Sequence, residues 1–256
     1  MLTATPFAVA LESGAAVSAL AYPGQGDASL EPALVLVLAH GAGAPHTHPF
    51  MTAFARGLAG RGIDVVTFNF PYMERKRRIP DPPRRLEAAY RTVLRATRER
   101  LERGGRPPPP LLIGGKSMGG RIASQVIAED VRAGRDPGVA GLVFLGYPLH
   151  PPGRPDKPRA AHLPAIAAPM LFVQGSRDAF GRPDELRPVL ADCADAELVV
   201  VEGGDHSFKV RGRGLPPSRT STPRCRTPSP GGSPAACISI ASLRHYRARQ
   251  PSEGCR

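Results

Sequence analysis

A serine flanked by glycines is the first feature of the sequence that could perform chemistry. Ser117 lies in the segment GGKSMGG, with Gly115 two residues before it and Gly119 two residues after it. The apolar residues 111–113 precede the segment and a helical pattern follows it, which predicts a tight turn from a strand into a helix. Such a turn strains the backbone and exposes the hydroxyl above a helix N-terminus, where negative charge is stabilised. The pattern therefore predicts a nucleophile for acyl transfer.

The letters GKS in this segment also occur in phosphate-binding loops. That motif requires a glycine at position 110, where this chain has Pro110, and a loop where the apolar residues 111–113 stand. We therefore reject the phosphate-loop interpretation.

An acid and a histidine follow later strand-like runs. Asp178 comes after the apolar run 170–174, and His206 follows the run 197–201 within GGDHSF. A carboxylate can orient a histidine, and a histidine can accept and return a proton near neutral pH. The order Ser117, Asp178, His206 is the order expected when all three side chains sit at the carboxyl ends of one sheet. We therefore predict that these three residues form a catalytic triad.

Simpler interpretations exist for the acid and the histidine. Asp178 could be a solvated or helix-capping residue in a turn, and a histidine in a loop is usually a surface residue. Asp184 and Glu185 are alternative acids, but they lie where the first turn of the next helix is expected, and acids are favourable there.

The backbone donors for an oxyanion are predicted in two places. The segment HGAGA directly follows the apolar run 33–39, and its small residues allow close approach of a substrate. We predict that the N–H groups of Met118 and Ala42 stabilise the oxyanion, with Gly43 as the second choice for the latter. The alternative is an ordinary glycine-rich turn.

Two further groups of residues near this segment could bind ligands. His46 and His48 are spaced as metal ligands can be, but no third Cys, His or acid accompanies them, so we expect them to shape the pocket or cap the next helix. The basic run 75–78 (RKRR) is either a solvated surface or a segment that attracts an anionic substrate. We expect no metal and no cofactor.

Strands and helices alternate along the body of the chain, which predicts a mostly parallel sheet with helices on both faces. The expected strands are 33–39, 64–70, 111–114, 141–146, 170–174 and 197–201. The expected helices are 49–61, 82–103, 117–132 and 183–191, and the first thirty residues are expected to form an antiparallel edge hairpin. Residues 148–169 are predicted as a proline-rich loop with one helical turn.

Charge and composition change near residue 210. Residues 211–256 hold nine arginines and one acid, hence +8 of the net charge of +12, and three of the four cysteines. We predict a domain over residues 1–210 and a disordered tail over 211–256, with 236–243 as the exception. The body then carries little excess charge, so neither nucleic acid nor a membrane is expected as its partner. The absence of a signal-peptide pattern, of a membrane-length apolar run and of a disulfide pattern favours the cytoplasm.

Six segments together resemble one known family. They are LAHGAGAPHTHPFM, FNFPYME, IGGKSMGGRIAS, GYPLHPPGRPDK, LFVQGSRDAFG and VEGGDHSFKV. They are similar to the dienelactone-hydrolase-like branch of the α/β-hydrolases, and within it to small bacterial relatives of the hydrolase-like domain of the third subunit of the human nonspecific-lethal complex and of a testis-expressed protein. The resemblance covers about residues 12–210. It implies the α/β-hydrolase fold and the triad Ser117, Asp178 and His206.

The family resemblance also implies a final helix that this sequence does not contain. Relatives continue past DHSFKV into an amphipathic helix, whereas this chain becomes rich in Arg, Pro and Ser. We interpret residues 211–256 as the product of a frameshift near Val210, or as a genuine tail that leaves the last helix missing.

The predicted function is hydrolysis of an ester or another acyl bond of a small molecule. Some relatives act as scaffolds, so a non-catalytic binding module is the alternative, and nucleic-acid binding by the arginine-rich tail is a second one. The acyl group and the oligomeric state do not follow from the sequence.

Overall fold

The structure is a computed structural model that describes residues 3–25, 34–103 and 109–210. The predictions for residues 211–256, namely the disordered tail, the segment 236–243, the missing final helix and the frameshift, lie outside the described residues. None of the described helices is both long enough and apolar enough to cross a membrane.

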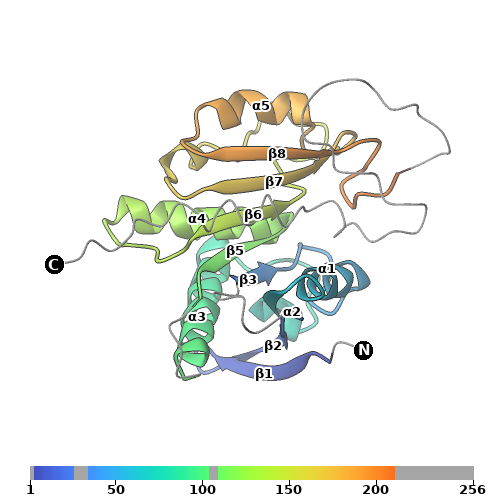
Figure 1. The fold of residues 1–256 in the computed structure, drawn as a ribbon. Coiled ribbons are helices and arrows are strands. Elements are labelled where there is room, and N and C mark those ends of the chain that lie inside the picture. The colour runs from blue at the N-terminus through green and yellow to red at the C-terminus, as the bar shows by residue number, and fades with distance from the viewer. Residues whose placement is uncertain (1–2, 26–33, 104–108, 211–256) are drawn as a thin grey trace.

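The described strands form one eight-stranded sheet in the order β1-β2-β4-β3-β5-β6-β7-β8. In Figure 1 the sheet runs from β1 at the bottom to β8 at the top. The pairings β1–β2 and β2–β4 are antiparallel, and the other pairings are parallel. The strands are β1 (Thr5–Ala10), β2 (Ala16–Tyr22), β3 (Leu34–Ala39), β4 (Ile63–Phe68), β5 (Leu111–Lys116), β6 (Gly141–Leu145), β7 (Met170–Gly175) and β8 (Ala196–Val201).

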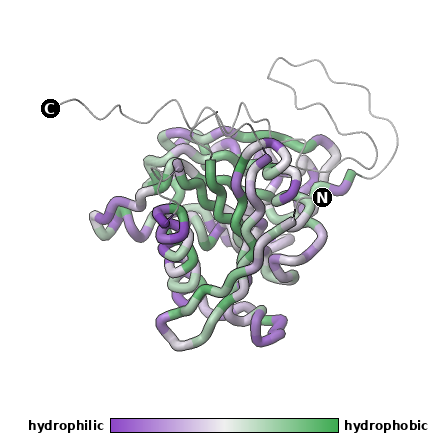
Figure 2. The backbone as a smooth tube through the Cα atoms, turned by 60° about the horizontal axis from the view of Figure 1, so that its bottom comes forward, coloured by the Kyte–Doolittle hydropathy of each residue, from purple (hydrophilic) through white to green (hydrophobic). Residues whose placement is uncertain are grey.

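The central strands are apolar on both sides because both faces of the sheet are covered. Successive side chains of a strand point to opposite faces. In β3, Val35 and Val37 accordingly enter one hydrophobic core, and Leu36 and Leu38 enter the other. Figure 2 shows the hydrophobic chain concentrated in the interior strands and the hydrophilic chain in the outer segments.

Helices cover the two faces unequally. Helix α1 packs on the face of Leu36 and Leu38, whereas α3, α4 and α5 pack on the face of Val35 and Val37. Figure 1 shows α1 and α3 on opposite sides of the sheet. The helices are α1 (Pro49–Ala59), α2 (Pro71–Glu74), α3 (Pro83–Glu102), α4 (Met118–Arg132) and α5 (Pro183–Ala191). The predicted α/β architecture is confirmed.

The main differences between the observed and the predicted elements lie in two places. Strand β4 ends at Phe68, and the short helix α2, which the sequence did not predict, follows it. Strand β5 extends to Lys116, so the chain passes from strand to helix through Ser117 alone. The predicted edge hairpin is present as β1 and β2, and the helical turn in the proline-rich loop is a 3₁₀ turn at Leu163–Ala165.

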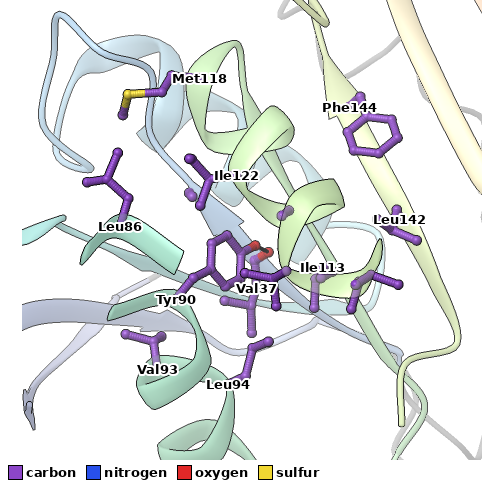
Figure 3. Close-up of a cluster of buried hydrophobic side chains, with 14 of the residues drawn as sticks. Val37, Leu86, Tyr90, Val93, Leu94, Ile113, Met118, Ile122, Leu142 and Phe144 are labelled. Atoms are coloured by element: carbon purple, nitrogen blue, oxygen red, sulfur yellow. Dashed lines mark hydrogen bonds between the residues drawn. The ribbon is translucent and has the colours of Figure 1, made fainter. Parts of the chain in front are cut away.

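A buried tyrosine links the two strands that lead to the candidate site. Figure 3 shows the Tyr90 ring of α3 among Val37, Ile113 and Ile122. Its hydroxyl accepts the Gly114 N–H at 3.0 Å and lies 2.7 Å from the Gly114 carbonyl oxygen and 2.9 Å from that of Val37. Because β3 and β5 end at the same edge of the sheet, this contact fixes the relative position of the segments that follow them.

Candidate active site

Ser117 occupies the turn between β5 and α4 in a strained conformation. Its φ and ψ angles are 52° and −117°, a combination that a residue with a side chain rarely adopts. The Ser117 N–H donates to the Leu145 carbonyl oxygen at 3.1 Å, and its own carbonyl accepts the Arg121 N–H at 3.1 Å. Strand pairing on one side and the first helical turn on the other therefore hold the residue in this conformation.

Two glycines make the turn at Ser117 possible. A Cβ at Gly115 would lie 2.5 Å from the Gly119 carbonyl carbon, and a Cβ at Gly119 would lie 2.5 Å from the Ala39 carbonyl oxygen. Both distances are shorter than any real Cβ contact. The glycines that the sequence placed two residues before and after the serine thus stand where a side chain has no room.

The structure brings the three residues of the predicted triad together. His206 Nε2 lies 2.9 Å from Ser117 Oγ, and His206 Nδ1 lies 2.7 Å from Asp178 Oδ2. The carboxylate of Asp178 accepts only from a protonated nitrogen, so Nδ1 carries the hydrogen in neutral His206. Nε2 is then free to accept the Ser117 hydroxyl proton.

Asp178 is held by donors on both of its oxygens. The residue is 1% exposed. Its Oδ1 accepts the Phe180 N–H at 2.8 Å, and its Oδ2 accepts from Gln174 Nε2 at 2.9 Å in addition to His206. These donors fix the orientation of the buried carboxylate.

The imidazole of His206 is positioned by an aromatic ring as well as by the acid. The ring stacks on Phe180 with a centroid distance of 4.2 Å and an interplanar angle of 29°. Phe180 follows Asp178 in the same turn, so one turn after β7 supplies both the carboxylate and the stacking surface.

The HGAGA segment is fixed to the chain that follows β4. His40 Nδ1–H donates to the Gly41 carbonyl oxygen at 2.7 Å, and His40 Nε2 accepts the Phe70 N–H at 3.0 Å. The hydroxyl of Tyr72 in α2 donates to the Ala42 carbonyl oxygen at 2.9 Å. Burial lowers the pKa of His40 to about 4, which is consistent with a neutral imidazole in these roles.

The N–H groups predicted to bind an oxyanion have no acceptor in the described part of the chain. Within the described ranges, no hydrogen bond uses the N–H of Ala42, Gly43 or Met118. Gly41 packs against the nucleophile, since a Cβ there would lie 3.6 Å from Ser117 Cβ. The segment therefore presents free donors next to the candidate nucleophile.

Lys116, directly before the candidate nucleophile, is buried. It is 8% exposed, and its Nζ has no hydrogen-bond partner among the residues that the structure describes. The ammonium faces the rings of Phe50 and Phe208 at 5.7 and 5.9 Å. Burial lowers the pKa of Lys116 to about 8, against the opposing effect of Asp178 and Asp205.

A cavity of about 500 Å³ adjoins the HGAGA segment. Its walls come from that segment, from the end of β4, and from α2 with the basic run that follows it. The lining residues are Ala42, Gly43, Pro45, Asn69, Met73, Lys76, Arg77 and Arg78.

The histidines considered as metal ligands have structural partners. His46 is 3% exposed, and its Nδ1 lies 3.1 Å from the Thr67 hydroxyl. His48 caps α1 by accepting the Phe50 N–H at Nδ1, so the prediction of a capping role is confirmed for this residue. No cluster of three or more His, Cys, Asp or Glu suited to a metal ion occurs in the part of the chain that the structure describes.

Sequence reasoning missed several residues that position the site. Gln174 lies inside β7 and is fully buried, and Tyr72 lies in the helix that was not predicted. One signal was available for Gln174: an amide at the end of an otherwise apolar strand requires a buried partner. Nothing local indicated that Tyr72 would reach Ala42.

Comparison with known proteins places the chain among α/β-hydrolases. A family model described as an alpha/beta hydrolase domain matches residues 32–219. An α/β serine hydrolase homologue from Coxiella burnetii is 20% identical, with 81% of this chain and 91% of that chain covered at a TM-score of 0.64.

Two other solved structures give similar values. An α/β serine hydrolase without a lid, from Xanthomonas campestris, is 20% identical over 80% of this chain and 86% of its own, with a TM-score of 0.59. A protein from Klebsiella pneumoniae assigned as a dienelactone hydrolase is 19% identical over 80% and 88%, with a TM-score of 0.58. At sequence identities this low, the structural similarity supports the fold alone.

Proposed function

The chain belongs to the α/β-hydrolase domain family, and from this premise we propose that it is a serine hydrolase that cleaves an ester or lactone bond of a small molecule. The observation that carries the proposal is the continuous hydrogen-bonded chain from Ser117 through His206 to Asp178, with distances of 2.9 and 2.7 Å. A serine in a left-handed conformation at a helix N-terminus supports the same role.

The first half of the reaction transfers the acyl group to the enzyme. His206 Nε2 takes the Ser117 proton while Oγ forms a bond to the acyl carbon, and the carbonyl oxygen becomes an oxyanion. When the bond from the acyl carbon to the leaving oxygen breaks, the same proton passes from His206 to that oxygen, and the alcohol departs.

The second half of the reaction regenerates the enzyme with water. A water molecule gives a proton to His206 Nε2 and forms the new bond to the acyl carbon, again through an oxyanion. The bond to Ser117 Oγ then breaks, the proton returns from His206 to Oγ, and the carboxylic acid leaves. One water is consumed, and no cofactor takes part in the balance.

In each half of the reaction an imidazolium and an oxyanion form together, and each of these charges has a proposed stabilising partner. The buried Asp178 carboxylate stabilises the imidazolium that His206 becomes. The N–H groups of Met118 and Ala42 are the donors proposed for the oxyanion, with Gly43 as the second choice beside Ala42. One donor of this kind is worth about 3–4 kcal/mol in the transition state.

Labelling with a fluorophosphonate probe tests the proposal, because only an activated serine reacts. We expect the chain to be labelled and the Ser117→Ala variant not to be. Ser124 provides a matched control, since its Oγ lies 2.7 Å from His162 Nε2 but it sits inside α4. Ser124→Ala should therefore keep the label.

A folded chain that takes no label would overturn the proposal and favour the non-catalytic binding module. A label that survives Ser117→Ala would assign the reactivity to another serine. A positive label, followed by hydrolysis of 4-nitrophenyl acetate that is lost in Ser117→Ala, would establish the reaction class.

A further inference from the structure

The basic run beside the cavity carries charge that the fold does not neutralise. Arg75 is the exception, because its guanidinium binds both oxygens of Asp81 at 2.8 and 3.0 Å. Lys76, Arg77 and Arg78 have no acidic partner within 4.0 Å among residues 3–25, 34–103 and 109–210. The three cations that line the cavity are thus the unpaired ones.

The acids closest to this run in sequence are engaged elsewhere. Glu74 accepts the N–H and the hydroxyl of Ser18 at 2.7 and 2.5 Å. Asp81 is 9% exposed and is held by Arg75 and by Arg85, the latter at 3.8 Å. Glu74 also bonds to Asn69, which lines the cavity, but no Asp or Glu is itself among the described lining residues.

The backbone of the basic run has a defined shape. The Lys76 N–H donates to the Met73 carbonyl oxygen and the Arg77 N–H to that of Tyr72, both at 2.9 Å. Lys76 has a φ angle of 52°, a strained value for a residue with a side chain. The Tyr72 hydroxyl, which donates to the Ala42 carbonyl oxygen, holds the backbone at the start of the run beside the HGAGA segment.

The cavity lies within reach of a substrate bound at Ser117. Gly41 contacts Ser117, and the next two residues, Ala42 and Gly43, line the cavity. Two residues of chain span at most about 7 Å. A group about four bonds beyond the acyl carbon can therefore extend over the cavity wall.

The order of the strands indicates which part of the substrate extends into the cavity. The leaving oxygen must lie near His206, which follows β8, because His206 protonates it. The cavity lies over β3 and β4, on the other side of Ser117 along the sheet order β4-β3-β5-β6-β7-β8. The acyl group, rather than the leaving alcohol, is directed towards the cations.

We propose that this cavity binds a phosphate or phosphonate group carried by the acyl part of the substrate, an assignment that rests on the proposed ester hydrolysis at Ser117. One arginine can satisfy both oxygens of a carboxylate. Three unpaired cations in consecutive positions instead match a group with three acceptor oxygens and about two negative charges.

Three methyl esters with the same three-methylene spacer test this assignment. They are methyl 4-phosphonobutanoate, monomethyl glutarate and methyl pentanoate, which end in a phosphonate, a carboxylate and a methyl group. We expect kcat/KM at pH 8 and low salt to be about tenfold higher for the phosphonate than for methyl pentanoate, and higher than for monomethyl glutarate. The advantage should shrink as salt is added.

Variants with matched changes of charge separate a binding site from general attraction. Arg77→Gln/Arg78→Gln should bring the ratio of phosphonate to pentanoate close to one. Arg103→Gln/Arg187→Gln removes the same charge from exposed positions at the end of α3 and in α5, and should keep the ratio. Thermal unfolding of each variant checks that it is folded.

Several outcomes would overturn the assignment. They are equal rates for the three esters, a carboxylate rate that matches the phosphonate rate, or an equal loss of the ratio in both double variants. Calorimetric titration of methyl 4-phosphonobutanoate into the Ser117→Ala chain tests binding without turnover. If no ester is hydrolysed and no fluorophosphonate label forms, the proposed function fails, and this titration still decides whether the cavity binds the phosphonate.

Discussion

Lys116 Nζ and His206 Nδ1 both border the Cα of Gly146: a Cβ there would lie 3.0 Å from the first atom and 3.3 Å from the second. Gly146 has a φ angle of 66°, and it begins the loop after β6. A side chain at this position would crowd both the ammonium and the imidazole, and the positive φ also favours glycine. An ammonium with no hydrogen-bond partner among the described residues therefore lies near the imidazole of the candidate site.

Replacement of Lys116 by methionine should stabilise the protein at neutral pH. Burial lowers the pKa of Lys116 from 10.5 to about 8, so the unfolded chain binds more protons than the folded chain between these values. The folded state therefore carries a penalty that is complete below pH 8 and fades as the pH rises towards 10.5. The shift corresponds to about 3 kcal/mol as an upper value, because Phe50 and Phe208 offset part of it.

Urea unfolding of both proteins at pH 7 and at pH 9.5 measures this effect. Lys116→Met should exceed the parent in free energy of unfolding at pH 7, and the difference should be smaller at pH 9.5. Other titrating groups are common to the two proteins and cancel. A variant that is less stable at pH 7, or a difference that does not change with pH, would contradict the burial argument.

Asp178→Asn should reduce kcat for an activated ester by about 10⁴ without unfolding the chain. The asparagine oxygen can still accept the Phe180 N–H, but its NH₂ group would then face Gln174 Nε2 and His206 Nδ1–H. His206 can accept a hydrogen bond from this NH₂ group only if its own hydrogen moves from Nδ1 to Nε2. A protonated Nε2 can no longer accept the serine proton.

Asp205→Asn is the control for this change, because Asp205 is next to the histidine in sequence and its Oδ1 accepts only backbone N–H groups in the described chain, at 2.8 and 3.0 Å. An amide oxygen can accept the same bonds, so this variant should stay active. Equal activities of the two variants in a 4-nitrophenyl acetate assay would remove Asp178 from the triad.

The sequence allowed prediction of the features that depend on neighbours in the chain. The glycines at 115 and 119 can be predicted because they flank the serine at a fixed spacing, although the atoms that exclude a side chain there include the Ala39 carbonyl oxygen of β3. A buried strand such as β3 is apolar whatever lies around it. Helix α2 is only four residues long, and its Tyr72 is oriented by a bond to Ala42, thirty residues away. Gln174 likewise has partners across the fold, including the Tyr147 N–H at 2.8 Å. A local pattern can show that Gln174 needs a buried partner, but it does not identify partners this far away in the sequence.

Substitution of two buried tyrosines should distinguish an effect on catalysis from an effect on the stability of the fold. Tyr90→Phe removes the hydroxyl that joins β3 to β5 and should lower the free energy of unfolding by about 1–3 kcal/mol, while kcat is kept. Tyr72→Phe removes the bond to the Ala42 carbonyl oxygen and should lower kcat by about 10- to 100-fold through misplacement of the oxyanion donors. Urea unfolding and ester hydrolysis of both variants test the pair, and the reverse pattern would show that Ala42 does not depend on Tyr72.

Acid should destabilise the protein through His40. Burial lowers its pKa from 6.5 to about 4, so between these values the unfolded chain binds a proton that the folded chain does not. The free energy of unfolding should therefore fall by up to about 3 kcal/mol from this residue as the pH drops from 6.5 to 4. The structural reason lies at Nε2, which accepts the Phe70 N–H at 3.0 Å. A proton on Nε2 would turn this acceptor into a donor and place two N–H groups opposite each other.

His40→Gln tests this argument because a glutamine can both donate and accept but does not titrate. Its free energy of unfolding should be lower than that of the parent at pH 7, since its shape fits the site less well, but it should decline less steeply between pH 6.5 and pH 4. His162, whose pKa is also lowered to about 4 by burial, is present in both proteins and contributes equally. Parallel declines in urea unfolding would mean that His40 is protonated in the folded state, and that the hydrogen bond from Phe70 does not hold the segment next to the nucleophile.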